Sequence, residues 1–233
     1  MILSLVEVNT YYGTSHVLQD VSLGVAQGDV VALLGRNGVG KTTTLRTIMG
    51  LTPPATGGIL FNGREVRAEP PWNKAKMGLA YMPDDLRIFS DLTCEENLDI
   101  AAYLVKRKGY WDKKKVMDLF PVLAERRGQK GLNMSGGEKK MLSLARALMS
   151  NPSVVLLDEA SEGLAPMIVR SLAEAIGTIR SHGMTILLAD QNLKFCRRVC
   201  DRGYIIEKGQ IVHEGGMEEI WQDQEVVNKY LAL

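Results

Sequence analysis

The sequence predicts an α/β fold with a parallel β-sheet around a phosphate-binding loop. Residues 35–42 read Gly-Arg-Asn-Gly-Val-Gly-Lys-Thr, between the apolar run 30–34 and the segment 42–49, which has neither Gly nor Pro. Two later apolar runs, 153–157 and 184–189, flank a helical pattern at 166–180. Short apolar runs between helices are typical of buried parallel strands. We therefore expect strand, loop and helix at 30–49, and a right-handed βαβ unit later in the chain.

Residues 1–30 and 58–63 are expected to form a second, antiparallel sheet. Apolar residues alternate along 5–8 and 17–25, and the turn 27–29 reads Gln-Gly-Asp. The run 58–61 is followed by Asn62-Gly63, a pair typical of tight hairpin turns. This sheet would lie beside the bound nucleotide.

The middle of the chain is expected to be helical from Asp91. Thr93 and Glu96 have the spacing of a capping box, and a Lys-rich amphipathic stretch covers 111–127. A hairpin at 208–209 and an amphipathic helix at 217–231 would end the chain. The prediction is one domain over 1–233, with a β subdomain and phosphate-loop core in about 1–85, a helical subdomain in about 86–150 and the remaining core in about 151–233.

Composition limits the possible functions. The chain has 28 basic and 27 acidic residues in 233, so no global field favours nucleic acid or an anionic membrane. No apolar stretch approaches the roughly 18 residues of a membrane span, and residues 1–12 lack the features of a secretory leader, so we expect a cytosolic chain. Three cysteines do not make a disulfide framework, and Cys196 and Cys200 are expected to be half-buried thiols.

The phosphate-binding loop predicts a nucleoside triphosphate ligand. Its glycines allow the backbone to turn tightly and direct several N–H groups at one anion. The following helix would direct its positive end at the phosphates, Lys41 would supply a point charge, and the Thr42 hydroxyl would face Mg²⁺.

Two adjacent carboxylates, Asp158 and Glu159, end the apolar run 154–157. Successive strand residues point to opposite sides, so the two acids are expected to have different roles. Asp158 would hold Mg²⁺, and Glu159 would polarise a water directed at the γ-phosphorus.

The segment 134–138, Met-Ser-Gly-Gly-Glu, begins the most regular helical pattern in the chain. Ser135 and Glu138 have capping-box spacing, so one interpretation is a well-capped helix and nothing more. However, each of the two glycines costs about 1 kcal/mol of helix propensity. A close approach of the backbone to a second anion would explain them.

Taken in chain order, these three motifs resemble those of the ATP-binding cassette (ABC) ATPases across essentially the whole chain. Within that family the chain is similar to the LivF-type ATPase subunits of branched-chain amino-acid importers. The segments that carry the closer resemblance are 12–13, 34–38, 81–89, 148–152, 163–166 and 190–192.

The resemblance implies a role for each matching residue. Tyr12 would stack on the adenine, with Tyr11 as a competitor. Glu159 would be the catalytic base, assisted by Gln191 and Asp84, while Thr42, Asp158 and Asp84 would hold Mg²⁺. The residues implied to bind the nucleotide are Tyr12, Gly35, Arg36, Asn37, Gly38, Val39, Gly40, Lys41, Thr42 and Thr43, and those implied to reach ATP on a partner cassette are Ser135, Gly136, Gly137 and Glu138.

Four positions depart from the general cassette pattern. Asp84 replaces the lid glutamine, Gln191 the switch histidine, Ala160 a proline and Ala165 an aspartate. Asp84 accepts but does not donate hydrogen bonds, and Gln191 donates without a charge. Asp84 and Gln191 also fit the LivF-like pattern, and the sequence leaves open how they affect the rate of ATP turnover.

The resemblance also implies partners and a location. The chain would use ATP and Mg²⁺, close against a second cassette that is a copy or a relative, and work beneath membrane permease subunits served by a solute-binding protein. It would be peripheral on the inner face of the cell membrane. A membrane helix would dock at about Asp84 to Leu104 against Leu86, Ile88, Phe89 and Leu92, unless these side chains only pack the helical subdomain onto the core.

Two alternative functions remain at this stage. A soluble cassette acting on nucleic acid, chromosomes or ribosomes would be expected to have a coiled coil, tandem cassettes or a basic stripe, which this sequence lacks. A regulatory cassette would bind ATP and hydrolyse it poorly, and Glu159 argues against it.

Overall fold

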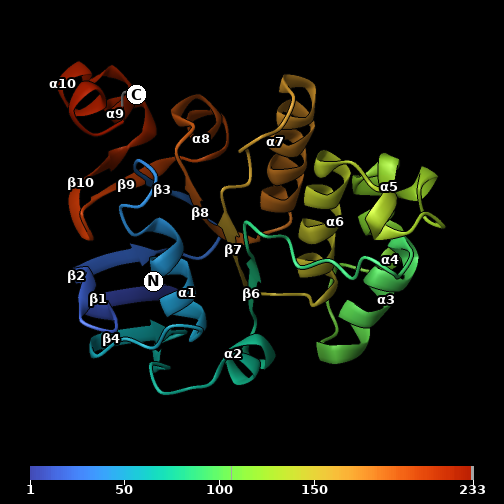
Figure 1. The fold of residues 1–233 in the computed structure, drawn as a ribbon, viewed down its shortest axis with the longest axis horizontal. Helices are drawn as coiled ribbons and strands as arrows, with labels where there is room; N and C mark the ends of the chain where they lie inside the picture. Colours follow the sequence, from blue (N-terminus) through green and yellow to red (C-terminus); the bar gives the residue numbers. More distant parts are fainter. Residues whose placement is uncertain (106, 232–233) are drawn as a thin grey trace.

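The computed structural model describes residues 1–105 and 107–231, and the side chains of residues 104 and 105 are not described. A six-stranded sheet lies at the centre, in the order β10-β9-β3-β8-β7-β6 (Figure 1). Its strands are β3 (Val30–Leu34), β6 (Leu79–Met82), β7 (Val154–Asp158), β8 (Thr185–Asp190), β9 (Arg202–Glu207) and β10 (Gln210–Gly216). All neighbours are parallel except β9 and β10, which form the hairpin predicted at 208–209. The predicted α/β class is confirmed.

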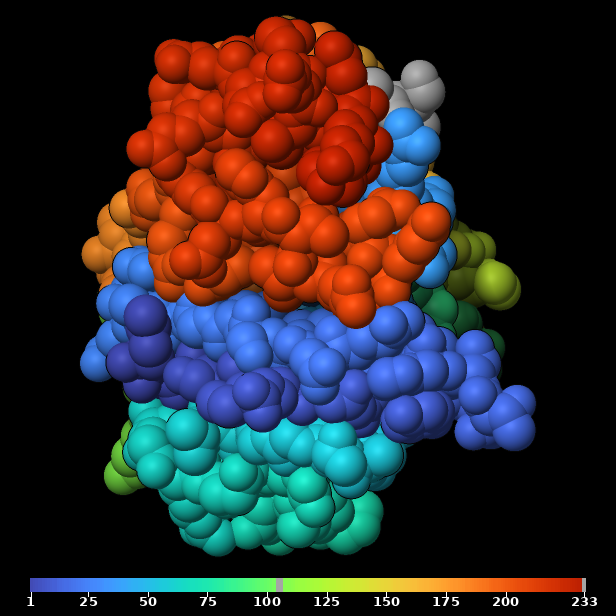
Figure 2. All heavy atoms as spheres, turned by 90° about the vertical axis from the view of Figure 1, so that its left-hand side faces the viewer, coloured from blue at the N-terminus to red at the C-terminus, as the bar shows by residue number. Residues whose placement is uncertain are grey.

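A second sheet is antiparallel, as expected, with the order β2-β1-β4-β5. Its strands are β1 (Leu3–Tyr12), β2 (Ser15–Val25), β4 (Thr56–Phe61) and β5 (Arg64–Glu65). The turn between β4 and β5 is Asn62-Gly63, and both residues have positive φ, at 51° and 74°. Figure 2 shows β1 and β2 as a blue band between the orange and red C-terminal segment and the cyan region that holds β4, β5 and α2 (Pro71–Met77).

The parallel strands of the central sheet are buried, and alternate residues along them enter two apolar cores on opposite faces. The edge strand β10 has no buried residue. Val31 and Leu33 of β3 contribute to the core that contains helix α1 (Lys41–Met49) and the antiparallel sheet. Ala32 and Leu34 contribute to the core on the opposite face of the sheet, called the second core below, which is filled by the other large helices. Each fully buried Val or Leu contributes roughly 1.5–3 kcal/mol, so this alternation fixes the strand orientation.

The helices of the second core come from the middle and the end of the chain. The middle ones are α3 (Cys94–Val105), α4 (Lys113–Leu119), α5 (Pro121–Glu125) and α6 (Gly136–Met149), preceded by the 3-10 turn η1 (Gly131–Asn133). They lie together on the right of Figure 1. Helix α7 (Pro166–Ser181) connects the parallel strands β7 and β8, which confirms the predicted βαβ unit. Helix α8 (Leu193–Val199) follows β8.

Several sequence expectations need correction. Helix α2 and strand β6 were not anticipated. The expected helical stretch 111–127 is two helices, because Pro121 cannot continue α4 and starts α5 instead. The expected helix 217–231 is three short pieces, α9 (Met217–Gln222), α10 (Gln224–Val226) and the π-helical turn η2 (Val227–Leu231), because Asp223 caps a new helix at the Val226 N–H.

The cysteine prediction was also wrong in degree. Cys94, Cys196 and Cys200 are free thiols buried in the second core. Cys196 and Cys200 are therefore buried and not half-buried as predicted. Within the described ranges, no helix is both long and apolar enough to span a bilayer.

Candidate nucleotide site

The phosphate-binding loop joins β3 to α1 as the sequence predicts. Gly40 has φ of 118°, which disfavours any residue with a side chain, and a Cβ there would also lie 3.0 Å from the Leu18 side chain. Lys41 is buried, and its ammonium donates 2.9 Å hydrogen bonds to the carbonyls of Gly35 and Arg36. Arg36, Asn37 and Gly38 are exposed at the crest of the loop, whereas Gly35 and Thr43 are buried and Val39 and Thr42 are partly buried.

Asp158 lies at the carboxyl end of β7 and faces the loop. Its carboxylate accepts hydrogen bonds from the Thr42 hydroxyl at 3.0 Å and from the Tyr81 hydroxyl at 2.9 Å. Burial raises the pKa of Asp158, and the two hydrogen bonds oppose that rise. Tyr81 was part of the resemblance but was given no role, because sequence does not reveal that β6 lies beside β7. It is a site residue that sequence reasoning missed.

The Glu159 side chain has different surroundings from that of Asp158 because the backbone turns between the two residues. Strand β7 ends at Asp158, and Glu159 has φ of 47°, so simple strand alternation does not describe its direction. Its N–H donates to the Ala189 carbonyl at 2.8 Å, and its carboxylate lies 3.5 Å from the Lys41 ammonium. Burial raises the pKa of Glu159 and the Glu162 carboxyl adds to the rise, whereas Lys41 lowers it. A carboxylate with a raised pKa is the stronger base.

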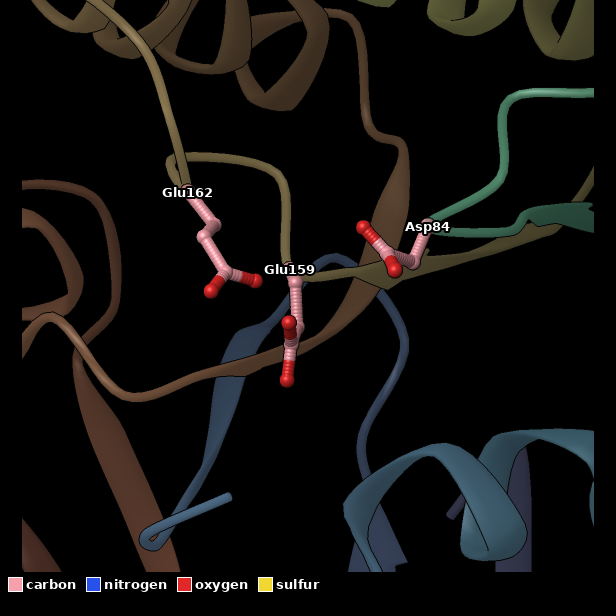
Figure 3. A group of neighbouring side chains, drawn as sticks. All are labelled: Asp84, Glu159 and Glu162. Carbon is pink, nitrogen blue, oxygen red and sulfur yellow. The ribbon is translucent and has the colours of Figure 1, made fainter. Parts of the chain in front are cut away.

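Three carboxylates meet at this edge of the sheet. Side-chain oxygens of Asp84, Glu159 and Glu162 lie within 4.8 Å of one another. Figure 3 shows Asp84 and Glu162 on opposite sides of Glu159. Asp84 follows β6, so the structure brings it to Glu159 as the resemblance implies. Glu162 was not among the predicted residues, although its place three residues after Glu159 was a usable signal.

The end of β8 completes the same edge. Asp190 is buried, and its carboxylate accepts from the Ser161 N–H and hydroxyl at 3.0 Å each and from the Asn192 N–H at 2.9 Å. It therefore ties the turn after Glu159 to the segment that carries Gln191. Gln191 borders a cavity of about 500 Å³ that is also lined by Gly35 and Arg36 at the phosphate-binding loop. Sequence reasoning gave Asp190 no role of its own.

The segment 135–138 forms a group at the start of α6. Ser135 and Glu138 make the predicted capping box, with bonds of 2.8 and 3.3 Å, and Glu138 also lies 3.5 Å from Arg126. A Cβ on Gly137 would lie 3.1 Å from the Ile168 side chain, so packing inside the chain explains that glycine. A Cβ on Gly136 would meet no atom of the described residues within 4 Å. Packing against the described part of the chain therefore does not explain Gly136.

The two candidate adenine-stacking residues make different contacts. Tyr11 stacks on His16 with ring centroids 4.2 Å apart, and the Tyr12 hydroxyl lies 3.2 Å from the Thr52 hydroxyl beyond the end of α1. Both rings are exposed, at 43% and 45%. Both surfaces remain accessible to a planar ligand, and the choice of Tyr12 stays a prediction.

Fold and site together define a phosphate-loop nucleotide hydrolase, with a lysine, a threonine and two acids at one edge of a parallel sheet. Residues 18–162 match the family model described as ABC transporter. Over 216 residues, the chain is 42% identical to the high-affinity branched-chain amino acid transport ATP-binding protein BraG of Pseudomonas aeruginosa, covering 92% of this chain and 93% of BraG. The chain belongs to the ATP-binding subunits of the ABC transporter family, and it is an ATPase.

Other relatives extend the comparison. A probable branched-chain amino acid transport ATP-binding protein LivF of Archaeoglobus fulgidus is 34% identical over 224 residues, with 95% of each chain covered. The lipopolysaccharide export ATP-binding protein LptB of Escherichia coli is also 34% identical, over 229 residues, with 95% of this chain and 93% of LptB covered. A solved ATP-binding subunit of an ABC transporter has a TM-score of 0.83 at 28% identity and covers 99% of this chain and 96% of its own. Proteins named for branched-chain amino-acid transport and for lipopolysaccharide export thus both match this chain over most of its length.

Proposed function

We propose that this chain is the ATP-hydrolysing subunit of an importer for branched-chain amino acids or a related small polar solute. The observation that carries the proposal is the 42% identity to BraG, against 34% to the export protein LptB. The chain would work as a peripheral subunit on the cytoplasmic face of the membrane, beneath permease subunits that receive solute from a binding protein.

The site geometry supports a division of labour during hydrolysis. Lys41 would exchange its bonds to the loop carbonyls for bonds to the β- and γ-phosphates, while the loop N–H groups hold the phosphate oxygens. Glu159 would accept a proton from the attacking water, and its burial favours that role. Asp84 lies beside Glu159, and Gln191 borders the cavity at the phosphate-binding loop. These two side chains would orient the water and the γ-phosphate.

The donor set at Asp158 fits Mg²⁺. Mg²⁺ prefers oxygen ligands, and the Thr42 hydroxyl and the Asp158 carboxylate are oxygen donors 3.0 Å apart at the loop. When bound there with ATP, Mg²⁺ would neutralise charge that develops on the transferred phosphoryl group. Thr42 and Asp158 would hold it, and the Tyr81 hydroxyl would keep the Asp158 carboxylate oriented.

A second cassette would complete each ATP site. Packing against the described residues does not explain Gly136, and the capped N-terminus of α6 offers free N–H groups to an anion. We propose that Ser135, Gly136 and Gly137 bind the γ-phosphate of ATP held by a partner cassette. The partner would be a second copy or a related ATPase subunit.

The membrane subunits would dock at a cavity of about 320 Å³ beside residues 83–87. We call residues 83–87 the lid segment, because Asp84 replaces the lid glutamine. Leu51, Tyr81, Leu86 and Ala147 are among its lining residues, and Trp72, which follows the lining residue Pro71 in the chain, is 65% exposed. Of the four apolar residues expected at this surface, Leu86 and Ile88 are partly buried against the second core, and Phe89 is 41% exposed. The expected range ended at Leu104, whose side chain lies outside the described residues. A short membrane-protein helix would enter this cavity.

Uptake by cells tests the importer proposal. Deleting the chain is expected to abolish uptake of labelled leucine, isoleucine or valine, and re-expression of the wild type is expected to restore it. Glu159→Gln is expected not to restore it, because the amide cannot accept the proton of the attacking water. Normal branched-chain amino-acid uptake in the deletion strain, with a defect in lipopolysaccharide export instead, would overturn the importer assignment and leave the ATPase assignment standing.

Light scattering on a sizing column tests the completion of the site by a partner. We expect purified Glu159→Gln protein to dimerise with Mg-ATP, because this variant does not hydrolyse the bound triphosphate. Without Mg-ATP we expect it to be monomeric. Gly136→Asp in the same background is the control, because its carboxylate would repel the γ-phosphate. A monomer that still binds ATP would identify a different cassette as the partner.

A further inference from the structure

Lys140 connects helix α6 to the turn that carries Glu159. It lies just over one helical turn beyond Ser135 and is 7% exposed. Its ammonium donates hydrogen bonds to the Glu159 carbonyl and, at 2.7 Å, to the Glu162 carbonyl. One buried cation thus holds both ends of the four-residue turn that follows β7.

A buried lysine at this position is costly unless its contacts compensate. Burial lowers the pKa of Lys140, while the nearby carboxylates of Asp84, Asp190, Glu162 and Glu159 oppose that change. The contact also explains the conformation of Glu159, whose φ of 47° is uncommon for a residue with a side chain. Such backbone persists where surrounding contacts hold it.

The same face of α6 donates hydrogen bonds to the backbone of the lid segment. The Ser143 hydroxyl donates to the Leu86 carbonyl at 3.2 Å, and the Arg146 guanidinium donates to the Arg87 carbonyl at 2.7 Å. Leu86 and Arg87 directly follow Asp84 and Asp85 in the lid and also have positive φ. Residues 140, 143 and 146 repeat every three positions, so they share one face of the helix. Helix α6 thereby holds the backbone beside each of the three clustered carboxylates.

We propose that Lys140 is a positioning residue: it transmits movement of the glycine start of α6, engaged by ATP on a partner cassette, to Glu159 of its own chain. The inference rests on the proposed completion of each site by a second cassette. A rigid helix moves as a unit, so a shift at Ser135 is carried to the Lys140 ammonium and from there to the two carbonyls. In a closed pair, ATP at one site would then set the catalytic carboxylate of the other site.

Substitutions on α6 separate this role from a purely structural one. Lys140→Met keeps the long stem and removes the donors, Lys140→Arg keeps charge and donors, and Lys140→Gln keeps a shorter donor. Lys139→Met is the matched control, because its ammonium lies on the same helix and, among the described residues, donates a hydrogen bond only to the Leu132 carbonyl, at 3.5 Å. The measurements are kcat, KM and the Hill coefficient for ATP hydrolysis, with the melting temperature and the ATP-dependent dimerisation of each variant in the Glu159→Gln background.

For Lys140→Met we expect kcat to fall about 10- to 100-fold, since small displacements of a catalytic group cost about that much. KM and dimerisation should change less than about twofold, and the Hill coefficient should fall toward 1. Lys140→Arg should recover most of kcat, Lys140→Gln should be intermediate, and Lys139→Met should match the wild type.

Three results would overturn the proposal. Unchanged kcat in Lys140→Met would remove Lys140 from catalysis. A lower melting temperature with normal kcat would make it a structural tie alone. If Lys140→Met does not fold, Lys140→Gln decides, and a wild-type kcat and Hill coefficient in that variant would refute the coupling. A failed uptake assay with these kinetic effects intact would reject the importer assignment and not the role of Lys140.

Discussion

Replacing Tyr81 with Phe would remove one hydrogen bond from the proposed magnesium-holding carboxylate and nothing else. The Tyr81 hydroxyl donates to one oxygen of Asp158 at 2.9 Å, and the Thr42 hydroxyl donates to the other at 3.0 Å. Asp158 is fully buried, so solvent does not replace the lost donor. A hydrogen bond to a charged group contributes about 1.5–3 kcal/mol. We expect Tyr81→Phe to lower the free energy of unfolding by about 2 kcal/mol, which for a chain of this size lowers the melting temperature by about 4–8 °C.

The effect of Tyr81→Phe on the free energy of unfolding should depend on pH, and the direction of that dependence follows from the Asp158 carboxyl. The hydrogen bond stabilises the ionised form of Asp158, so it lowers the pKa of that carboxyl in the folded state. Its contribution to stability is therefore present at pH values above the Asp158 pKa and is lost as the pH falls through it. The difference between wild type and Tyr81→Phe should shrink as the pH is lowered from about 7.5 toward 4.5.

Urea unfolding of the two proteins at several pH values measures the effect. Tyr11→Phe is the matched control, because its ring is exposed and stacks on His16 away from the carboxylates. A difference below about 0.5 kcal/mol, which is the scatter of ordinary surface substitutions, would refute the reasoning. So would a loss of the same size at every pH, since it would point to packing instead of the ionised carboxylate.

Two further predictions concern a buried lysine and the adenine contact. Burial lowers the pKa of Lys74 to about 8 from 10.5, so the unfolded chain binds more protons between these values and stability should rise with pH. The unfolding free energy of the wild type relative to Lys74→Met should increase between about pH 7 and 10 by at most about 3 kcal/mol. Urea unfolding measures it, the exposed Lys76→Met is the control, and a flat difference would contradict the prediction. For the adenine contact, Tyr12→Ala should weaken ATP binding by about 1–2 kcal/mol, or roughly 5- to 30-fold, while Tyr11→Ala should change it little. Titration with a fluorescent ATP analogue measures both, and the reverse order would assign the contact to Tyr11.

Much of the site was predictable because its main parts are contiguous. A strand, a glycine-rich turn and a helix start are encoded in residues 30–49, and the tight turn at Gly40 needs no distant partner to identify it. The stretches 111–127 and 217–231, which were each expected to be one helix, also contained local signals for a break, Pro121 and Asp223. The amphipathic pattern obscured these signals. Patterns of charge and apolar spacing give the approximate extent of a helix, while caps and prolines give its ends.

The sequence by itself determined the phosphate-binding loop, the capped glycine start of α6 and the acid pair, since each depends on neighbours within a few residues. It also predicted the βαβ unit, because two short apolar runs flank a helical pattern. Only the tertiary structure decided which side chains surround the acids. Tyr81 reaches Asp158 because β6 lies next to β7. Asp190 holds the turn after β7 because β8 lies on the other side of β7. Lys140 reaches the Glu159 carbonyl from helix α6. These contacts join residues 19 to 77 positions apart. Strand order and helix packing bring them together, and both are set by the burial of the two apolar cores as a whole.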